Sequence, residues 1–238
     1  LRLRLYKYIR FGERDKTFQR EILGYSTPLV PNGISWWVIN VSDRTIISMM
    51  ISTAANGVYA VASKYSSILN AFNNIFMMSW TEAASMHINA PDRDKFFSQV
   101  ANTAVRLFGA MGLGLIAVMP LVFPLMVSKE FSEAYLYIPI MVMSVCFNAI
   151  VSIYSAVYVA KKKTKQVMNT SLVSAVINIV LTIAFTPIFG LYAAAGATAI
   201  AFLAMAIYRH YDAKKYVKIT YETKLFVILG ALYTVVML

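Results

Sequence analysis

The chain has 238 residues, of which 59% are hydrophobic and only 14% are charged, and its formal net charge is +11 at pH 7. A water-soluble domain carries about 25% charged residues and fewer apolar ones, so this composition excludes the soluble globular class. The apolar residues fall in blocks of about 20 or more, the length needed to cross a bilayer. The sequence therefore predicts an all-α, polytopic transmembrane helix bundle.

Seven apolar segments follow one another along the chain and predict membrane-spanning helices. The segment that precedes them, 1–21, is charged but lacks the apolar run of a signal peptide. The predicted spans are 26–52, 56–90, 96–127, 133–160, 166–187, 190–209 and 222–238. Short connections make consecutive spans antiparallel. Because the last span is short and no initiator Met is present, we expect the chain to be a piece of a larger protein.

Basic residues lie almost entirely in alternate connections between the spans. Eighteen of the 22 Lys and Arg residues, Arg209 among them, fall in one set of connections, whereas the opposite set holds only Lys129. Positive residues mark the cytoplasmic side of a membrane protein. The net charge therefore reflects membrane topology, and no nucleic-acid partner is expected.

Five ionisable residues remain inside the predicted spans: Asp43, Arg44, Lys64, Glu82 and Arg106. Such groups face a bundle interior or a hydrated cavity, and by default they mark function. Counted from the turns, Asp43 and Lys64 lie at similar depth, and so do Glu82 and Arg106. Two structural ion pairs are therefore an alternative to a functional site. They leave one cation, most simply Arg44, which needs water or an anion.

Polar and small residues recur at helical spacing on four of the spans. The rows are Asn32, Trp36, Asn40 and Asp43; Lys64, Ser67, Asn74, Glu82 and Ser85; Asn102, Arg106 and Gly109; and Ser171, Ser174, Asn178 and Thr182. A single residue of this kind often serves only to hydrogen-bond a neighbouring helix. Four rows together favour a shared polar cavity.

Sequence signatures of catalysis and metal binding are absent. There is no nucleophile–base signature, no glycine-rich phosphate loop, no zinc-ligand spacing and no pair of carboxylates at a common depth. The single cysteine, Cys146, lies inside an apolar block and excludes an intramolecular disulfide. We therefore expect neither enzyme activity nor a cofactor or metal site.

Three stretches of the sequence together resemble a known family. They are YSTPLVPNGISWWVINVSDRTIISMMISTAANGVYAVASKYSSILN, VYVAKKKTKQVMNTSLVSAVINIVLTIAFTPIFGLYAAAGATAIAF and SWTEAASMHINAPDRDKFFSQ. Their order and spacing are similar to the C-terminal half of bacterial polysaccharide flippases of the Wzx type, within the multidrug/oligosaccharidyl-lipid/polysaccharide exporter superfamily. The resemblance implies one six-helix lobe of a two-lobe flippase over 22–215. It also implies a basic cytoplasmic inter-lobe linker over 1–21 and part of an additional transmembrane helix over 216–238.

The resemblance implies a function: translocation of an undecaprenyl-pyrophosphate-linked oligosaccharide across the bacterial cytoplasmic (inner) membrane by alternating access, for capsule or O-antigen export. The implied partners are this lipid-linked oligosaccharide, the phospholipid bilayer, an N-terminal lobe of the same protein and a glycan polymerase. The candidate substrate-binding residues are Arg44, Lys64, Asp43, Asn40, Trp36, Asn74, Glu82 and Arg106. Arg44 and Lys64 are expected to meet the pyrophosphate, and Asp43 to hold its basic neighbours in place.

Two other functions stay open at this point. A cation-coupled drug or metabolite exporter of the same superfamily needs acidic residues in its cavity, whereas basic residues inside the spans outnumber acidic ones three to two. The other is a membrane glycosyltransferase or polymerase partner, or a scaffold for that machinery, without transport activity. A polymerase should carry a large hydrophilic loop with catalytic residues outside the membrane. The longest connection between the spans, RHYDAKKYVK, is short and is predicted to be cytoplasmic.

Overall fold

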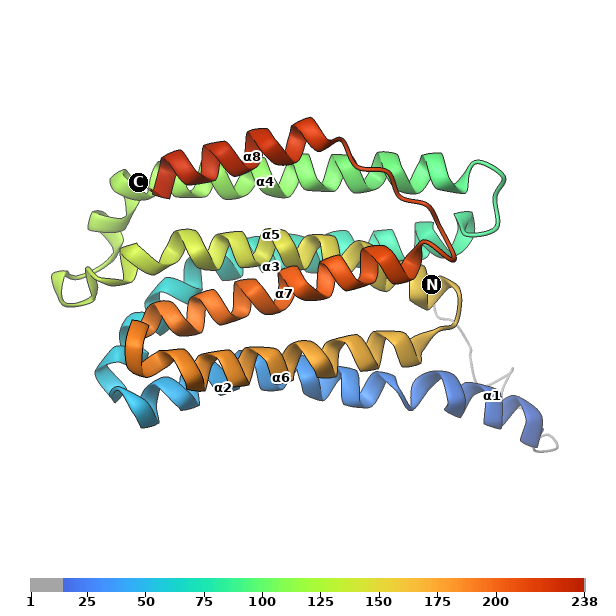
Figure 1. Ribbon diagram of the computed structural model, residues 1–238, viewed down its shortest axis with the longest axis horizontal. Coiled ribbons are helices and arrows are strands. Elements are labelled where there is room, and N and C mark those ends of the chain that lie inside the picture. Colours follow the sequence, from blue (N-terminus) through green and yellow to red (C-terminus); the bar gives the residue numbers. More distant parts are fainter. Residues whose placement is uncertain (1–14, 238) are drawn as a thin grey trace, which may run out of the picture.

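The computed structural model describes residues 15–237, and these residues fold into eight α-helices aligned along one direction (Figure 1). The helices are α1 (Lys16–Ser26), α2 (Leu29–Met50), α3 (Thr53–His87), α4 (Arg93–Met126), α5 (Ala134–Ala160), α6 (Thr164–Phe189), α7 (Leu191–Ala213) and α8 (Thr223–Met237), with a short 3-10 helix, η2 (Lys129–Phe131), before α5. Helices α2 to α7 correspond to the first six predicted spans, and α8 corresponds to the seventh. The predicted all-α transmembrane bundle is confirmed.

Helix α1 is absent from the predicted spans, because most of its residues belong to the segment expected to link two lobes. Its first turn is capped by the Asp15 carboxylate, which accepts hydrogen bonds from the backbone N–H groups of Thr17 and Phe18 at 2.9 and 3.0 Å. No residue of α1 is buried. A hydrogen bond from Lys162 lowers the pKa of the exposed Glu21 carboxyl. The rest of the expected linker, residues 1–14, lies outside the described part of the chain.

Consecutive helices run antiparallel, so the connections that follow α3, α5 and α7 all lie at one end of the bundle, on the right of Figure 1. These are the connections rich in Lys and Arg, and this end is therefore the cytoplasmic one. Among the described helices, α4 to α7 are long and apolar enough to cross a membrane. Helices α2 and α3 have sufficient length, 22 and 35 residues, but are less apolar. The arrangement is that of a multi-pass membrane protein.

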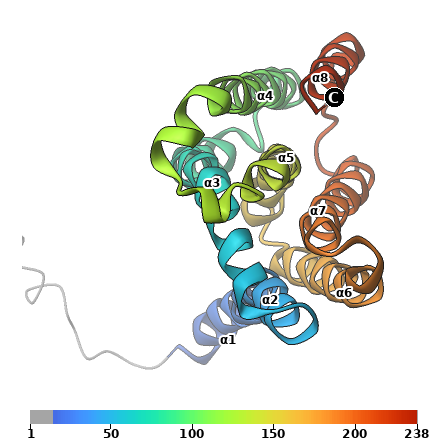
Figure 2. The same cartoon turned by 90° about the vertical axis from the view of Figure 1, so that its left-hand side faces the viewer.

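Helix α5 lies at the centre of the bundle, as the view along the helix axes shows (Figure 2). It is apolar on nearly all sides, and residues such as Val142, Ile153 and Tyr158 are almost completely buried in it. Helices α3 and α7 pack on α5, α6 packs on α7, and α2 packs on α6. Helix α4 packs against α5, and α8 lies beside α4.

A polar row on α4 holds the extended segment 217–222, here called the strap, which connects α7 to α8. Asp94 accepts a hydrogen bond from the backbone N–H of Lys218 at 3.1 Å. The Ser98 and Asn102 side chains bond further backbone groups of the strap, including the Thr220 carbonyl, which accepts from Asn102 Nδ2 at 2.9 Å. The prediction that the Asn102–Arg106–Gly109 row faces a cavity shared with the other rows is therefore wrong, because these residues face the strap and α8.

Two glycines of α4 leave the space in which side chains of α8 pack. A Cβ atom at Gly109 would lie 2.8 Å from Leu229, and a Cβ atom at Gly112 would lie 2.0 Å from the Tyr233 hydroxyl. That hydroxyl is also 3.2 Å from the Cys146 sulfur of α5. The small residues of α4 therefore allow the Tyr233 ring of α8 to reach the central helix.

Candidate functional site

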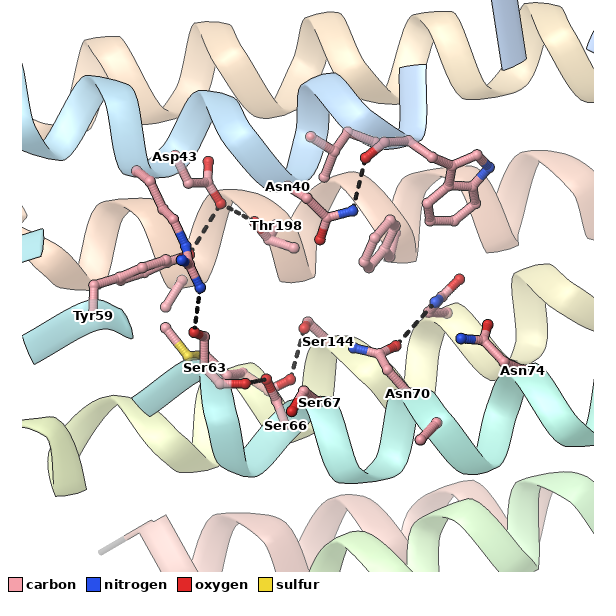
Figure 3. Close-up of a pocket in the computed structure, with 18 residues that line it drawn as sticks. Asn40, Asp43, Tyr59, Ser63, Ser66, Ser67, Asn70, Asn74, Ser144 and Thr198 are labelled. Carbon is pink, nitrogen blue, oxygen red and sulfur yellow. Dashed lines mark hydrogen bonds between the residues drawn. The ribbon is translucent and has the colours of Figure 1, made fainter. Parts of the chain in front are cut away.

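A polar cavity of about 580 Å³ lies among α2, α3, α5 and α7. Figure 3 shows its wall, with Asn40 and Asp43 on α2 facing Ser63, Asn70 and Asn74 on α3. The lining residues are Trp36, Ile39, Asn40, Asp43, Arg44, Tyr59, Ser63, Ser66, Ser67, Asn70, Ala71, Asn74, Met141, Ser144, Asn148, Ala195, Thr198 and Phe202. Most of them are hydroxyl or amide side chains, which a helix facing lipid does not need.

Asp43 is buried, with only 4% of its surface exposed, and its carboxylate joins four helices. Oδ2 accepts hydrogen bonds from the Tyr59 hydroxyl of α3 at 3.0 Å and from the Thr198 hydroxyl of α7 at 2.8 Å. Oδ1 accepts from the Thr182 hydroxyl of α6 at 3.3 Å. Within the described part of the chain, no Lys, Arg or His lies within 4.0 Å of this carboxylate. Neutral hydroxyl donors therefore satisfy the buried charge.

Arg44 follows Asp43 directly, but its side chain projects about 100° further round the helix. It is exposed at the cavity wall, and its Nη2 donates one hydrogen bond to Ser63 Oγ at 3.0 Å. No carboxylate pairs with it in residues 15–237. Most N–H donors of the guanidinium are therefore free. The acidic residue of the cavity wall, Asp43, does not pair with it, because its carboxylate accepts hydrogen bonds from hydroxyl groups.

The long polar edge of the cavity comes from α3 and α5. Ser63, Ser66, Ser67, Asn70 and Asn74 recur at intervals of three or four residues, so they share one face of α3. On α5, Ser144 and Asn148 stand opposite this face.

The two asparagines of this edge, Asn70 and Asn148, have hydrogen-bonding groups that are not used within the protein. Asn148 Nδ2 is 3.5 Å from Asn70 Oδ1, whereas the buried Asn148 Oδ1 has no hydrogen-bond partner. The edge therefore has acceptors and donors available to a ligand.

An aromatic wall closes the cytoplasmic part of the cavity. The Trp36 ring of α2 lies against the Phe202 ring of α7, with centroids 5.4 Å apart. One turn further along α2, Asn40 Nδ2 donates to the Trp36 carbonyl at 2.7 Å. Indole faces and amides of this kind are the groups that contact sugar rings, through apolar surface and hydrogen bonds.

Of the eight substrate-binding candidates, the structure brings Trp36, Asn40, Asp43, Arg44 and Asn74 to the cavity wall. It does not bring the other three there. Lys64 is exposed beside Ser63 but does not line the cavity, although it shares a helical row with Ser67 and Asn74. Glu82 is exposed near the cytoplasmic end of α3. Arg106 projects from α4 and forms an ion pair of 2.5 Å with Glu222 at the end of the strap.

Neither of the two ion pairs considered from the sequence forms. Asp43 bonds hydroxyls instead of Lys64, and Arg106 pairs with Glu222 instead of Glu82. An ion pair requires the two side chains to share an azimuth around the helix axes as well as a depth, and spacing from a turn cannot give that azimuth.

The polar row predicted on α6 joins helices rather than lining the cavity. Ser174 donates to the Ala201 carbonyl of α7, Asn178 donates to the Thr198 hydroxyl, and Thr182 donates to Asp43. None of these three lines the cavity. The α6 row therefore forms hydrogen bonds between helices, which is the structural role that single polar residues often have. Through Thr182 it also donates to the Asp43 carboxylate.

The sequence analysis did not predict the burial of one cation. Arg209, placed in a cytoplasmic connection by charge patterning, is fully buried near the end of α7. Its guanidinium donates to hydroxyls of Thr170, Ser171 and Ser155 and to the carbonyls of Val151 and Val167. These partners lie on α5 and α6, so Arg209 ties three helices together. The sequence around Arg209 gives only a weak signal of this burial, namely that the apolar helical pattern of α7 continues up to it.

Neither a protein-family model nor a curated protein matches the sequence. Solved structures of membrane transporters do match the fold. The MATE transporter VcmN from Vibrio cholerae in its bent form matches with a TM-score of 0.74 and 18% identity, over 92% of this chain and 52% of that one. A MOP-superfamily transporter from Pyrococcus furiosus matches with a TM-score of 0.69 and 16% identity, over 91% and 51%.

The lipid II flippase MurJ in an inward closed conformation matches with a TM-score of 0.72 and 18% identity, over 97% of this chain and 50% of that one. The chain thus spans about half the length of the solved structures that it matches. Its fold is similar to that of about one half of each of these transporters. The expected multi-pass location in the membrane is confirmed.

Proposed function

We propose that this chain is one lobe of a flippase that moves an undecaprenyl-pyrophosphate-linked oligosaccharide across the cytoplasmic membrane. The observation that carries the proposal is the Arg44 guanidinium, which faces the polar cavity with one hydroxyl partner and no carboxylate in the described part of the chain. A guanidinium is the side chain best matched to the paired oxygens of a phosphate group.

The rest of the cavity suits the glycan. Ser66, Ser67, Asn70 and Asn74 on one face of α3 supply hydroxyl and amide groups, and Trp36 supplies an aromatic surface. The volume of about 580 Å³ is within the range of ordinary ligand sites. A cavity bounded by one lobe would be completed by a second lobe across it. In the proposed cycle the two lobes rock about this midplane site, which opens alternately to each leaflet.

The experiment that tests this function compares Arg44→Ala with Lys64→Ala. Lys64 is a matched control, because it is an exposed cation in the same part of the lobe that does not line the cavity. Loss of a charged hydrogen-bonding group typically costs about 1.5–3 kcal/mol, which corresponds to a loss of transport of roughly tenfold to a hundredfold. The assay measures export of the polymer and flipping of the lipid-linked oligosaccharide in proteoliposomes, at equal protein abundance. Near-normal transport by Arg44→Ala would contradict the proposal.

A cation-coupled exporter is the second candidate, and the surroundings of Asp43 favour it. A buried carboxylate with three hydroxyl groups around it offers the oxygen ligands that a hard cation or a proton uses. Transport of a cationic dye that is lost in Asp43→Asn but kept in Glu82→Gln would support this candidate. Glu82 serves as the control because it is acidic and exposed but lies away from the cavity.

A further inference from the structure

A second hollow, of about 360 Å³, lies between α6 and α7 and shares no lining residue with the polar cavity. We call it the α6–α7 groove. Four of its eight lining residues are apolar, Val173 and Ile177 of α6 and Ala204 and Met205 of α7, and Ser174 lies among them. Val173 is 58% exposed, so the groove opens on the surface of the bundle. In a membrane-spanning helix pair, such a groove can hold a hydrocarbon chain.

One end of this groove is polar and faces the cytoplasm. Asn169, Thr170 and Tyr208 line it there, five to six residues from the start of α6 at Thr164 and five from the end of α7 at Ala213. Both of these helix ends lie at the end of the bundle where the basic connections gather (Figure 1). The groove therefore runs from the cytoplasmic interface toward the middle of the membrane.

Two lysines lie close in sequence to the residues at the cytoplasmic end of the groove, although neither lines it. Lys165 precedes Asn169 by one helical turn on the same face of α6, and Lys214 follows α7 directly, with its Nζ 4.6 Å from the centre of the Tyr211 ring. Both lysines are exposed, and no carboxylate pairs with either of them in residues 15–237.

The buried Arg209 adds a third charge behind the wall of the groove. Its Nε and Nη2 donate to the Thr170 hydroxyl at 3.0 and 2.7 Å, and Thr170 is itself a lining residue. All hydrogen-bond partners of this guanidinium are neutral oxygens. Its charge is thus uncompensated and lies one side chain away from the groove, so it favours an anion at this end.

We propose that the α6–α7 groove binds one anionic phospholipid of the cytoplasmic leaflet. An acyl chain lies along Val173, Ile177 and Met205, and the phosphate lies between Lys165 and Lys214 at the polar end. An apolar groove that opens to the bilayer and has three basic residues near its polar end matches both halves of such a lipid. This site is separate from the transport cavity and does not rest on the function proposed for it.

The test is a lipid titration of the intact protein in detergent, followed by native mass spectrometry. Phosphatidylglycerol and phosphatidylcholine with identical acyl chains are compared. We expect one phosphatidylglycerol molecule to bind more tightly than phosphatidylcholine. The double variant K165Q/K214Q should lower that affinity by roughly thirtyfold, since each lysine next to an anionic lipid contributes about 1 kcal/mol. Inorganic phosphate should not compete, because the acyl chain contributes to binding.

Two further variants complete the test. The control K95Q/K218Q removes two exposed cytoplasmic lysines on α4 and the strap, away from the groove, and should keep the affinity for phosphatidylglycerol. Val173→Trp should fill the groove and abolish the tightly bound lipid. Equal affinity for both lipids, equal losses in the two lysine variants, or an unchanged affinity in Val173→Trp would each overturn the proposal.

Discussion

The Asp43 carboxylate of α2 and the Thr198 hydroxyl of α7 lie 2.8 Å apart and link two helices that stand on either side of the cavity. Asp43→Ala removes the acceptor and leaves the hydroxyls of Tyr59, Thr182 and Thr198 without it. We expect the free energy of unfolding to fall by about 3 kcal/mol, since unpaired buried polar groups cost about 1–3 kcal/mol each. Thermal unfolding in a mild detergent measures the change.

The same link predicts coupling between the two sites. Thr198→Val should cost less stability in the Asp43→Ala background than alone, by about 1 kcal/mol, since their shared hydrogen bond is then already gone. The remaining cost is that of the Asn178 amide, which also donates to Thr198 at 2.9 Å. Thr45→Val is the control, because Thr45 is an exposed threonine of α2 that bonds only the carbonyl one turn before it. Simple additivity of the Asp43 and Thr198 variants would contradict the link.

Arg209→Lys should be a severe substitution even though it keeps the charge. A lysine ammonium has three donors on one atom and cannot reach the oxygens on both α5 and α6 that the planar guanidinium bonds. We expect a loss of stability of about 3 kcal/mol, as for other disrupted buried charges. Lys214→Gln removes an exposed charge five residues later and should change stability by about 0.5 kcal/mol or less. Equal unfolding midpoints for the two variants would show that Arg209 is not a structural tie.

Gly112→Ala should displace α8 from α4. The new methyl group would overlap the Tyr233 hydroxyl, and Val142 and Cys146 leave no space on the other side, at 3.0 and 3.3 Å. Because Cys146 is the sole cysteine of the chain, its reaction with a small maleimide reports the displacement and should accelerate. Gly114→Ala is the matched control, since nothing lies within 4 Å of its Cβ position. An unchanged rate in Gly112→Ala would mean that Tyr233 does not depend on this glycine.

Asn102→Ala should release the strap. The Asn102 side chain donates to the Thr220 carbonyl and accepts from the Glu222 backbone N–H, both at 2.9 Å. Without these bonds, trypsin should cleave after Lys218 several times faster in inside-out membrane vesicles. Thr103→Ala changes the exposed neighbour and should cleave at the rate of the unaltered protein. The prediction fails if both variants are cleaved at the same rate.

The arrangement of the spans could be predicted because hydropathy, short connections and lysine placement all depend on the chain alone. The predicted ends of α2 to α8 lie within four residues of the observed ones. Asp43 and Arg44 were recognisable as site residues because a charged pair within apolar helix has few structural uses. Their opposite situations, one buried among hydroxyls and one exposed to the cavity, follow from a single step of helical rotation.

Three features of the structure could not be predicted: the contacts of the α4 row, the partner of Asp43 and the burial of Arg209. They depend on how each helix is rotated about its axis relative to its neighbours, and a single sequence does not specify this rotation. The α4 row looked like a cavity wall but faces the strap, because α4 lies on the far side of α5 from α2. Tyr59 was not considered as a partner of Asp43, since a tyrosine within an apolar span carries no polar signal. Arg209 was counted with the loop charges because four lysines and arginines follow one another there, and patterning cannot tell a buried guanidinium from solvated neighbours.

The strap is held through its backbone amides and carbonyls, whereas α4 contributes side chains to these same bonds. The exposed strap positions, Lys218 and Thr220, can therefore accept other side chains without loss of these bonds, whereas the buried Val217 and Ile219 must stay apolar. Sequence variation in this short stretch is expected at alternate positions. Its cytoplasmic face could thus acquire new contacts without loosening the helix that follows.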